Sequence, residues 1–306
     1  MINQRTVKNN ISTKGIGLHS GRPVSITIRP ADINTGVIFR RIDLVGAPFI
    51  KAAALMVGDT RMCSCLEDGP VKIATIEHLM SALAGLGIDN VWVDLDSPEV
   101  PILDGSATPF LFLLNQAGIQ EQPALKKFLK IKEYVEVEDG DKKASFSPYN
   151  GYQLNFKINF THPAIQKTED TVSFDFGSNS YVKEIARART FGFAQEVEFL
   201  RENNLALGGG LFNAVVLDEY KVLNSEGLRY DSEFARHKIL DAIGDLFLIG
   251  YPILGRFDAY KSGHDLNNKL VRKILDTPQS YEITTFGKED LVPSGVEVWL
   301  GQEVLS

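Results

Sequence analysis

The spacing of apolar and polar positions predicts a first third of the chain that is rich in strands. Three short segments alternate or run apolar between glycine and proline residues, as strands do: residues 6–7, 24–28 and 36–40. Residues 72–86 then place apolar side chains at helical spacing. We expect Thr75 to cap this helix and Gly85 or Gly87 to end it.

A polar segment that contains a proline, residues 120–127, interrupts the pattern. It follows a strand predicted at residues 90–95 and a short helix predicted at residues 109–116. Polarity together with proline indicates a connection rather than a regular element. We therefore predict a linker here, between domains that comprise residues 1–122 and 128–306.

The second half starts again with strands and continues with helices. The predicted strands are residues 132–138, 152–160 and 214–217, and the predicted helices are residues 181–188, 195–203 and 231–248. In both halves, an amphipathic helix with a histidine ends at glycine and leads into an apolar segment. This parallel indicates a duplicated α+β unit, although the two halves share little sequence.

Composition narrows the classes of protein that fit. Of 306 residues, 44% are hydrophobic and 23% are charged, which is ordinary for a globular protein. The net charge of −7 argues against general nucleic-acid binding, which requires clustered lysine and arginine. No apolar run approaches the roughly 18 residues of a membrane helix, and the first residues do not resemble a secretory signal.

Cys63 and Cys65 are the only cysteines. Two positions apart on a strand, they would point to opposite faces, so a disulfide between them is unfavourable. We expect two half-buried thiols and a reducing, cytoplasmic location.

The most informative segment chemically is the helix predicted at residues 231–248. It aligns His237, Asp241 and Asp245 along one face, one turn apart, and directs Ile239 to the other side. An imidazole and a carboxylate one turn apart can bind one metal ion. A polar helix face without a metal is nevertheless the commoner explanation for such a pair.

A second histidine favours the metal site. Glu77 and His78 fall in the predicted first helix, where the helix dipole accounts for the acid but not for the imidazole. If His78 joins His237 and Asp241, the set matches a three-ligand hydrolytic zinc site. Glu77 could then act as a base on water at the metal.

His264 follows Ser262 and Gly263, where we expect a loop. Asp245 lies one turn beyond Asp241 and could orient and charge this histidine. Isolated loop histidines are usually solvated, so His264 by itself indicates little.

Together these segments match a known family. The matching segments are residues 17–21, 76–79, 100–106, 188–192, 236–245 and 261–264. In this order the chain closely resembles the UDP-3-O-acyl-N-acetylglucosamine deacetylases of lipid A biosynthesis, from Gly17 to about Leu270. The resemblance implies an α+β fold of two similar sandwich domains, each with a small insert, whose helices face each other.

The resemblance implies a hydrolytic metal site. His78, His237 and Asp241 would bind zinc, although Fe²⁺ also accepts two imidazoles and a carboxylate. Glu77 would take a proton from the zinc-bound water as that water attacks the acetamide carbonyl.

Three further residues would act on the tetrahedral intermediate and the leaving group. Thr190 would donate a hydrogen bond to the developing oxyanion. His264, charged and supported by Asp245, would stabilise the oxyanion and protonate the leaving amine.

The resemblance also implies contacts with the rest of the substrate. Lysines would meet the diphosphate, Phe160 would stack on uracil, and an apolar passage would hold the acyl chain. Helix packing explains most of the apolar residues equally well. The substrate-binding residues implied in this way are Lys238, Lys261, Lys142, Phe160, Phe191, Leu18, Phe193, Phe212 and His19.

Four other residues receive simpler interpretations. His19 would line the cleft rather than bind metal, and His162 would be a loop residue. Asp104, before a glycine, would form a turn. Cys63 could face the metal as a weak fourth contact.

The implied function is hydrolysis of the N-acetyl group of UDP-3-O-(3-hydroxyacyl)-N-acetylglucosamine. We expect a monomer that does not insert stably into membranes. One alternative is a zinc amidohydrolase of the same fold that acts on another N-acyl sugar. The other is a non-catalytic nucleotide-sugar or lipid-binding protein, which would have little reason to keep Glu77, His264 and three metal ligands together.

Overall fold

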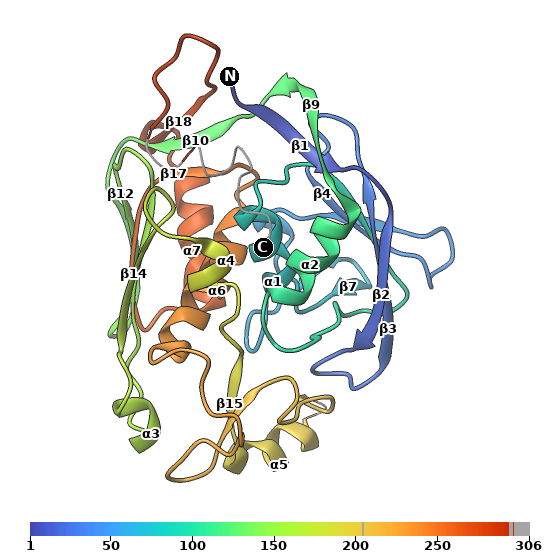
Figure 1. Ribbon diagram of the computed structural model, residues 1–306, viewed down its shortest axis with the longest axis vertical. Coiled ribbons are helices and arrows are strands. Elements are labelled where there is room, and N and C mark those ends of the chain that lie inside the picture. Colours follow the sequence, from blue (N-terminus) through green and yellow to red (C-terminus); the bar gives the residue numbers. More distant parts are fainter. Residues whose placement is uncertain (204, 294–295, 297–306) are drawn as a thin grey trace.

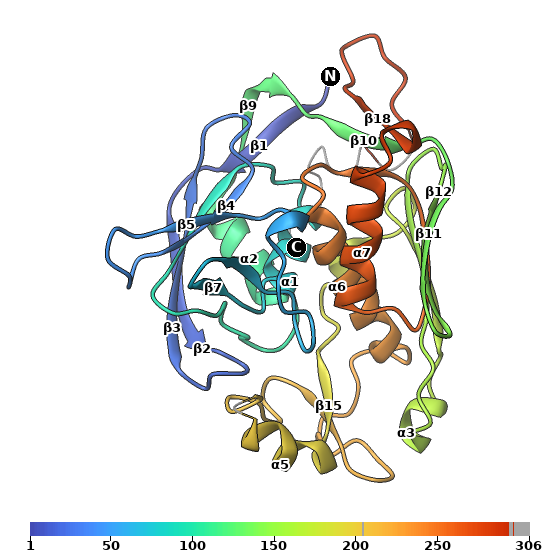
Figure 2. The same ribbon diagram turned by 180° about the vertical axis from the view of Figure 1, so that it is seen from behind.

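The computed structural model describes residues 1–203, 205–293 and 296. The fold is mixed α+β, as predicted, with two mixed sheets on opposite sides of a group of packed helices (Figures 1 and 2). The helices at the centre of the molecule are α1 (Glu77–Gly85), α6 (Glu233–Phe247) and α7 (His264–Leu275). No helix in the described part of the chain is long and apolar enough to cross a membrane.

The first sheet has five strands, and the strands predicted at residues 24–28, 36–40 and 90–95 belong to it. β8 lies at its centre, parallel to β4 and antiparallel to β3. Along β3, apolar side chains alternate with polar ones, and the apolar face is buried. In order across the sheet, the strands are β2 (Ile11–Ile16), β3 (Pro23–Pro30), β8 (Val91–Leu95), β4 (Val37–Arg41) and β5 (Phe49–Lys51).

The second sheet has seven strands arranged around β17 (Ile253–Tyr260). β17 is antiparallel to β12 and parallel to both β13 and β10. The other strands are β10 (Phe128–Ile131), β11 (Val135–Asp139), β12 (Lys142–Ser147), β13 (Tyr152–Lys157), β14 (Thr171–Asp175) and β18 (Tyr281–Thr284).

Smaller elements surround these two sheets. Three strand pairs are β1 (Asn3–Val7) with β9 (Ile119–Leu125), β6 (Leu66–Asp68) with β7 (Val71–Ile73), and β15 (Phe191–Phe193) with β16 (Val215–Leu217). The remaining helices are η1 (Ala54–Met56), α2 (Thr108–Ala117), α3 (Pro163–Gln166), α4 (Tyr181–Glu184), α5 (Ala194–Glu202) and η2 (Pro278–Ser280). β15 and α5 lie together at one end of the molecule (Figure 1).

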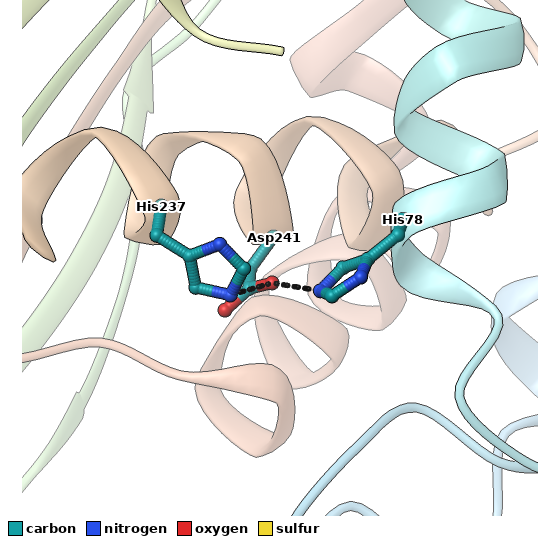
Figure 3. Close-up of side chains that lie close together, drawn as sticks. All are labelled: His78, His237 and Asp241. Atoms are coloured by element: carbon teal, nitrogen blue, oxygen red, sulfur yellow. Dashed lines mark ion pairs between the residues drawn. The ribbon is translucent and has the colours of Figure 1, made fainter. Parts of the chain in front are cut away.

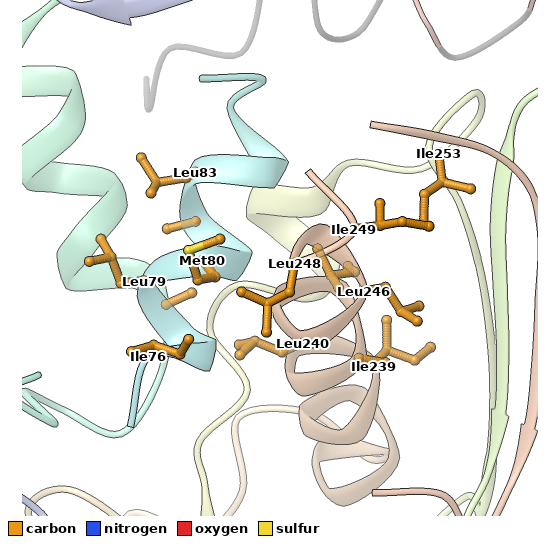
Figure 4. Close-up of a cluster of buried hydrophobic side chains, with 14 of the residues drawn as sticks. Ile76, Leu79, Met80, Leu83, Ile239, Leu240, Leu246, Leu248, Ile249 and Ile253 are labelled. Carbon is orange, nitrogen blue, oxygen red and sulfur yellow. The ribbon is translucent and has the colours of Figure 1, made fainter. Parts of the chain in front are cut away.

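The core of the molecule includes the contact between α1 and α6, where apolar side chains of both helices pack together (Figure 4). The backbones approach closely at Gly244, because a Cβ atom there would lie 2.1 Å from the carbonyl oxygen of Glu77. Both the apolar residue Ile239 and the polar residues His237 and Asp241 of α6 are buried. The polar face predicted for this helix therefore faces the protein interior rather than solvent.

The predicted linker at residues 120–127 is wrong as a description of local structure. β9 occupies most of it and pairs antiparallel with β1. Lys126 is fully buried, and its Nζ donates a hydrogen bond to the Gly87 carbonyl oxygen at 2.6 Å and lies 3.0 Å from Asp89 Oδ2. A two-stranded ribbon can carry polar side chains on its exposed positions, so its sequence is not apolar. The division at residues 122 and 128 stays a prediction.

The helix predicted at residues 72–86 begins later than expected. β7 occupies residues up to Ile73, and Thr75 has a φ of 58°, which no α-helix tolerates. The N-cap is Ile76 rather than Thr75, and it makes no side-chain capping bond. Apolar spacing alone did not separate the short strand β7 from the helix that follows it.

The two cysteines are buried rather than half-buried, at 8% exposure for Cys63 and 5% for Cys65. Both are free thiols. Burial raises the pKa of the Cys63 thiol, and the negative charge of Glu77 raises it further.

Candidate functional site

Three side chains that could bind a metal converge between α1 and α6 (Figure 3). Asp241 Oδ1 lies 3.5 Å from Nε2 of His78 and 3.3 Å from Nε2 of His237. All three side chains are buried. The structure thus brings together the three residues that the sequence analysis selected from two distant segments.

The donor set fits a divalent cation. With metal–ligand bonds near 2.05 Å, tetrahedral coordination separates neighbouring ligand atoms by about 3.3 Å, close to the spacing observed here. Asp241 Oδ1 is buried and has no hydrogen-bond partner among the described residues. A buried carboxylate oxygen that faces two imidazole nitrogens and lacks a proton donor is suited to a cation.

Neighbouring groups fix the orientation and the protonation state of these candidate ligands. His237 Nδ1 donates a hydrogen bond to the Ala188 carbonyl oxygen at 3.0 Å, which leaves the Nε2 lone pair free for a metal. Burial lowers the pKa of His237 to about 3, so the ring is neutral. Burial alone would raise the pKa of Asp241, but the positive charge of Lys238 helps to hold it well below its usual range. Lys238 Nζ donates to the other oxygen, Asp241 Oδ2, at 2.9 Å.

Glu77 lies on the cavity wall at the start of α1, next to His78. Glu77 is 4% exposed, and its Oε2 accepts a hydrogen bond from the Ser64 amide at 3.1 Å. Burial raises the pKa of Glu77, while the positive charge of His264 opposes this effect. A carboxylate with a raised pKa is a better proton acceptor at neutral pH.

We expected His264 to lie in a loop, but it is the first residue of α7. Its Nδ1 donates a hydrogen bond to Asp245 Oδ2 at 2.9 Å, so its Nε2 is left for the cavity. Asp245 also accepts hydrogen bonds from Ser64 Oγ at 2.6 Å and from Asn267 Nδ2 at 2.9 Å. Ser64 therefore contacts the carboxylates of both Glu77 and Asp245.

In the metal-free protein we expect His264 to titrate well above neutrality. Burial alone would lower the pKa of His264, but Asp245 raises it to about 9. The stabilisation from the charged ring is therefore complete below the unfolded-state pKa of about 6.5 and is lost as the pH rises through about 9. Histidine ¹⁵N NMR, assigned with His264→Gln, measures the midpoint.

Asp245→Asn serves as the comparison. Without the Asp245 carboxylate, Glu77 and Asp241 are the named charges that still oppose burial, so the midpoint of His264 should fall clearly below about 9. A midpoint that is the same in both proteins would show that Asp245 does not charge His264.

A cavity of about 810 Å³ contains this site and extends from it toward α5. Its walls come from both halves of the chain. The predicted site residues that line it are Leu18, His19, Glu77, His78, Lys142, Phe160, Thr190, Phe191, Phe193, His237, Lys238, Asp241 and His264.

Three predicted residues do not line the cavity. Asp245 is 1% exposed and lies behind His264. Lys261 forms an ion pair with Asp141 on the surface. Phe212 is 68% exposed.

Several lining residues were not predicted. Thr60, Arg61 and Met62 lie in an irregular segment without periodicity, so no pattern marks them. Leu200 in α5 lies three positions after Val197, and this helical spacing could have identified it. The apolar end of the cavity is therefore formed partly by α5.

Thr190 is held at the cavity by the backbone. Its amide donates to the Gly105 carbonyl oxygen at 2.8 Å, and its carbonyl accepts from the Val215 amide at 2.8 Å. The preceding residue, Arg189, is buried against Glu233 of α6, with Nε 2.9 Å from Oε1. This ion pair holds the segment with Thr190 against the helix that carries two of the candidate metal ligands.

We expect Arg189→Ala to destabilise the fold by about 3–5 kcal/mol, because it leaves the fully buried Glu233 without its cation. Urea unfolding followed by circular dichroism measures the change. As a control, Arg229→Ala breaks the partly exposed pair with Asp104 and should cost about 1 kcal/mol or less. Equal losses in the two variants would contradict the importance of burial.

The structure agrees with the simpler interpretations of Asp104 and His162, but not with a metal contact for Cys63. Asp104 forms a turn, in which its Oδ1 accepts from the Ser106 amide at 2.9 Å. His162 precedes α3 and caps it by accepting from the Ala164 amide. In the described part of the chain, Cys63 is not one of the residues in the metal-binding cluster.

A sequence model of the family described as LpxC, UDP-3-O-acyl N-acetylglycosamine deacetylase, matches residues 4–276. The match covers most of the chain, which therefore belongs to this family of metal-dependent deacetylases in lipid A biosynthesis. The buried His78, His237 and Asp241 cluster is its candidate metal site.

Proposed function

We propose that this member of the LpxC family uses zinc to hydrolyse the acetamide of UDP-3-O-(3-hydroxyacyl)-N-acetylglucosamine, with Glu77 and His264 as its proton-transfer groups. The observation that carries the proposal is their arrangement. A carboxylate with a raised pKa and a charged imidazole both line the cavity wall that contains the three candidate ligands. A protein that only binds its ligand has no use for such a pair.

The ligand residues would hold the ion through the Nε2 atoms of both histidines and Oδ1 of Asp241. When bound, zinc would supply Lewis-acid polarisation of the amide carbonyl and would acidify water toward a pKa of about 7. The His237 bond to the Ala188 carbonyl supports this assignment, because it fixes the tautomer that a metal requires. Fe²⁺ suits the same donor set.

Glu77 would accept a proton from water as the water oxygen bonds to the carbonyl carbon. His264 carries its second proton on Nε2, and this proton would pass to the amine nitrogen as the C–N bond breaks. Acetate and the free amine are the products. Thr190 would donate its hydroxyl hydrogen bond to the oxyanion that forms between these steps.

The rest of the substrate would occupy the remainder of the cavity. Lys142 and Lys238 are the lysines at its wall, and we assign the diphosphate to them. In the metal-free protein Lys238 bonds Asp241, so contact with phosphate would require its ammonium to be shared or moved. Lys261, which pairs with Asp141, would join them only after leaving that partner.

The aromatic residues divide between the nucleotide and the acyl chain. Phe160 would stack on uracil, and Phe191 lies beside it, with 5.5 Å between ring centroids. The acyl chain would follow Leu18, Phe193 and the apolar side of α5, with Phe212 near its exit. His19 would contact the substrate from the opposite wall.

The remaining expectations complete the proposal. We infer a monomeric, cytoplasmic enzyme built from two similar sandwich domains, residues 1–122 and 128–306, whose helices face each other. The two sheets on opposite sides of the helices support this division (Figure 2).

The test compares turnover of the acylated UDP-sugar with turnover of the same sugar without its acyl chain, by zinc-loaded protein. Burial of four methylenes alone corresponds to about 3 kcal/mol, so kcat/KM should differ by more than about 100-fold. Chelation should abolish turnover, and added zinc should restore it. Equal turnover of both sugars would instead indicate an amidohydrolase for another substrate, and activity that survives complete metal removal would contradict the mechanism.

A further inference from the structure

A buried carboxylate outside the metal site, that of Glu99, connects separate parts of the cavity wall. Glu99 is 2% exposed, and its backbone bridges to Ala74, just before α1. Its side chain accepts hydrogen bonds from the amides of His19 at 2.8 Å and Ser20 at 2.9 Å, and from the Thr75 hydroxyl at 3.1 Å. All three donors are neutral, and they come from two segments that are distant in sequence.

The first of these segments is the turn that carries His19. A Cβ atom on Gly17 would lie 2.2 Å from Glu99 Oε2, so this turn passes directly over the carboxylate. His19 lines the cavity and is 8% exposed, and its Nε2 has no hydrogen-bond partner among the described residues. A buried ring nitrogen of this kind is available to a ligand in the cavity.

The second segment leads into α1. Thr75 adopts a φ of 58°, which is unfavourable for a β-branched residue and persists only where surrounding contacts hold it. The hydrogen bond to Glu99 is one such contact. Thr75 is two positions before Glu77, so a shift at Thr75 would move the carboxylate that we assign as the base.

A third part of the wall is attached through the turn. The Leu207 amide donates to the His19 carbonyl oxygen at 3.1 Å, and the Gly208 amide donates to that of Leu18 at 2.9 Å. A Cβ atom on Gly208 would lie 2.3 Å from the Gly17 carbonyl oxygen. These contacts are so close that the turn with His19 cannot move unless the loop that follows α5 moves with it.

We propose that Glu99 is a positioning residue that fixes the distance between His19, on the substrate side of the cavity, and Glu77, on the catalytic side. The inference rests on the proposed function, because it assigns these two sides. Glutamine cannot replace Glu99, since its NH₂ group would face one of the three N–H or O–H donors. Among the described residues, Glu99 accepts its hydrogen bonds from His19, Ser20 and Thr75, none of which is a candidate metal ligand.

We expect Glu99→Gln to lower kcat/KM by about 10- to 100-fold, with the loss mainly in kcat, because misplacement of catalytic groups by about 1 Å has effects of this size. Zinc content should not change. The matched control is Asp89→Asn, which removes a carboxylate that accepts from the Arg5 amide and pairs with Lys126 beyond the other end of α1. This control should be destabilised without any change in kcat/KM.

A folded Glu99→Gln protein with wild-type kcat/KM would overturn the proposal, as would an equal loss in Asp89→Asn. If Glu99→Gln does not fold, Thr75→Val removes only one of the three hydrogen bonds and keeps the shape of the side chain. It should lower kcat, and an unchanged kcat would equally overturn the proposal.

Amide hydrogen exchange in the metal-free protein separates this inference from the proposed function. Loss of the Glu99 contacts should accelerate exchange at Leu207 and Gly208, although neither amide bonds to Glu99 directly. If the wild-type protein fails to turn over the acylated UDP-sugar, the proposed function is wrong. The exchange rates still decide whether Glu99 connects the turn with His19 to the loop that follows α5. Unchanged rates at both amides would show that it does not.

Discussion

Glu77→Gln is expected to lower kcat by about two to four orders of magnitude, which is the usual contribution of a general base. Glutamine has nearly the same shape and can still accept the Ser64 amide hydrogen bond. It cannot accept a proton from water at neutral pH. Because Glu77 lies outside the cluster of candidate ligands, the zinc content of the variant should equal that of the wild type.

Turnover of the acylated UDP-sugar and metal analysis of the same preparation measure these two effects separately. The control is Glu121→Gln, because this glutamate is 58% exposed and takes no part in the cavity. Full activity of Glu77→Gln with zinc bound would refute the assigned base. Loss of zinc together with activity would mean that Glu77 acts by holding the metal site instead.

Gly244→Ala is the second change for which we expect a large effect. Alanine normally favours a helix over glycine by up to about 1 kcal/mol, so propensity alone predicts stabilisation. Here the new Cβ would lie 2.1 Å from the Glu77 carbonyl oxygen, a backbone atom that cannot turn aside. Separation of α1 from α6 should cost about 3 kcal/mol, at the upper end for overpacking. It should also weaken metal binding by roughly tenfold or more, because His78 and the other two ligands lie on different helices.

Denaturant unfolding and zinc titration measure the two consequences. Gly192→Ala is the matched control for stability, because among the described residues nothing lies within 4 Å of a Cβ atom there. Its stability should stay close to that of the wild type. A stable Gly244→Ala protein with normal zinc affinity would mean that the contact between α1 and α6 can relax without moving the ligands.

Much of the site could be predicted because its chemistry is local in sequence. His237, Asp241 and Asp245 follow from helical spacing, which holds wherever the helix lies. The partnership of His78 with them could not come from spacing, since it depends on how α1 crosses α6. The chemistry of the residues made it a hypothesis, the resemblance to a known family implied it, and the structure then supplied the distances.

The errors have physical causes that are equally specific. The helix predicted at residues 72–86 starts too early, because pairing with β6 and the positive φ of Thr75 override the helical spacing of its first residues. Residues 120–127 were interpreted as a linker, although β9 occupies most of them, because a strand in a two-stranded ribbon needs no apolar face. No helix was predicted at α7, because His264 was interpreted as a loop residue. Leu266, Leu270 and Ile274 nevertheless recur at helical spacing.

The hydrogen bond from His237 to the Ala188 carbonyl limits which sequence changes this protein can accept during evolution. The acceptor belongs to the main chain, so a different side chain at position 188 would leave it in place. The orientation of the candidate ligand His237 and the position of the proposed oxyanion donor Thr190 both depend on this short stretch of backbone. Insertion or deletion of one residue between Ala188 and Thr190 would therefore shift one relative to the other. The segment should therefore accept some point mutations at Ala188 but almost no change in length.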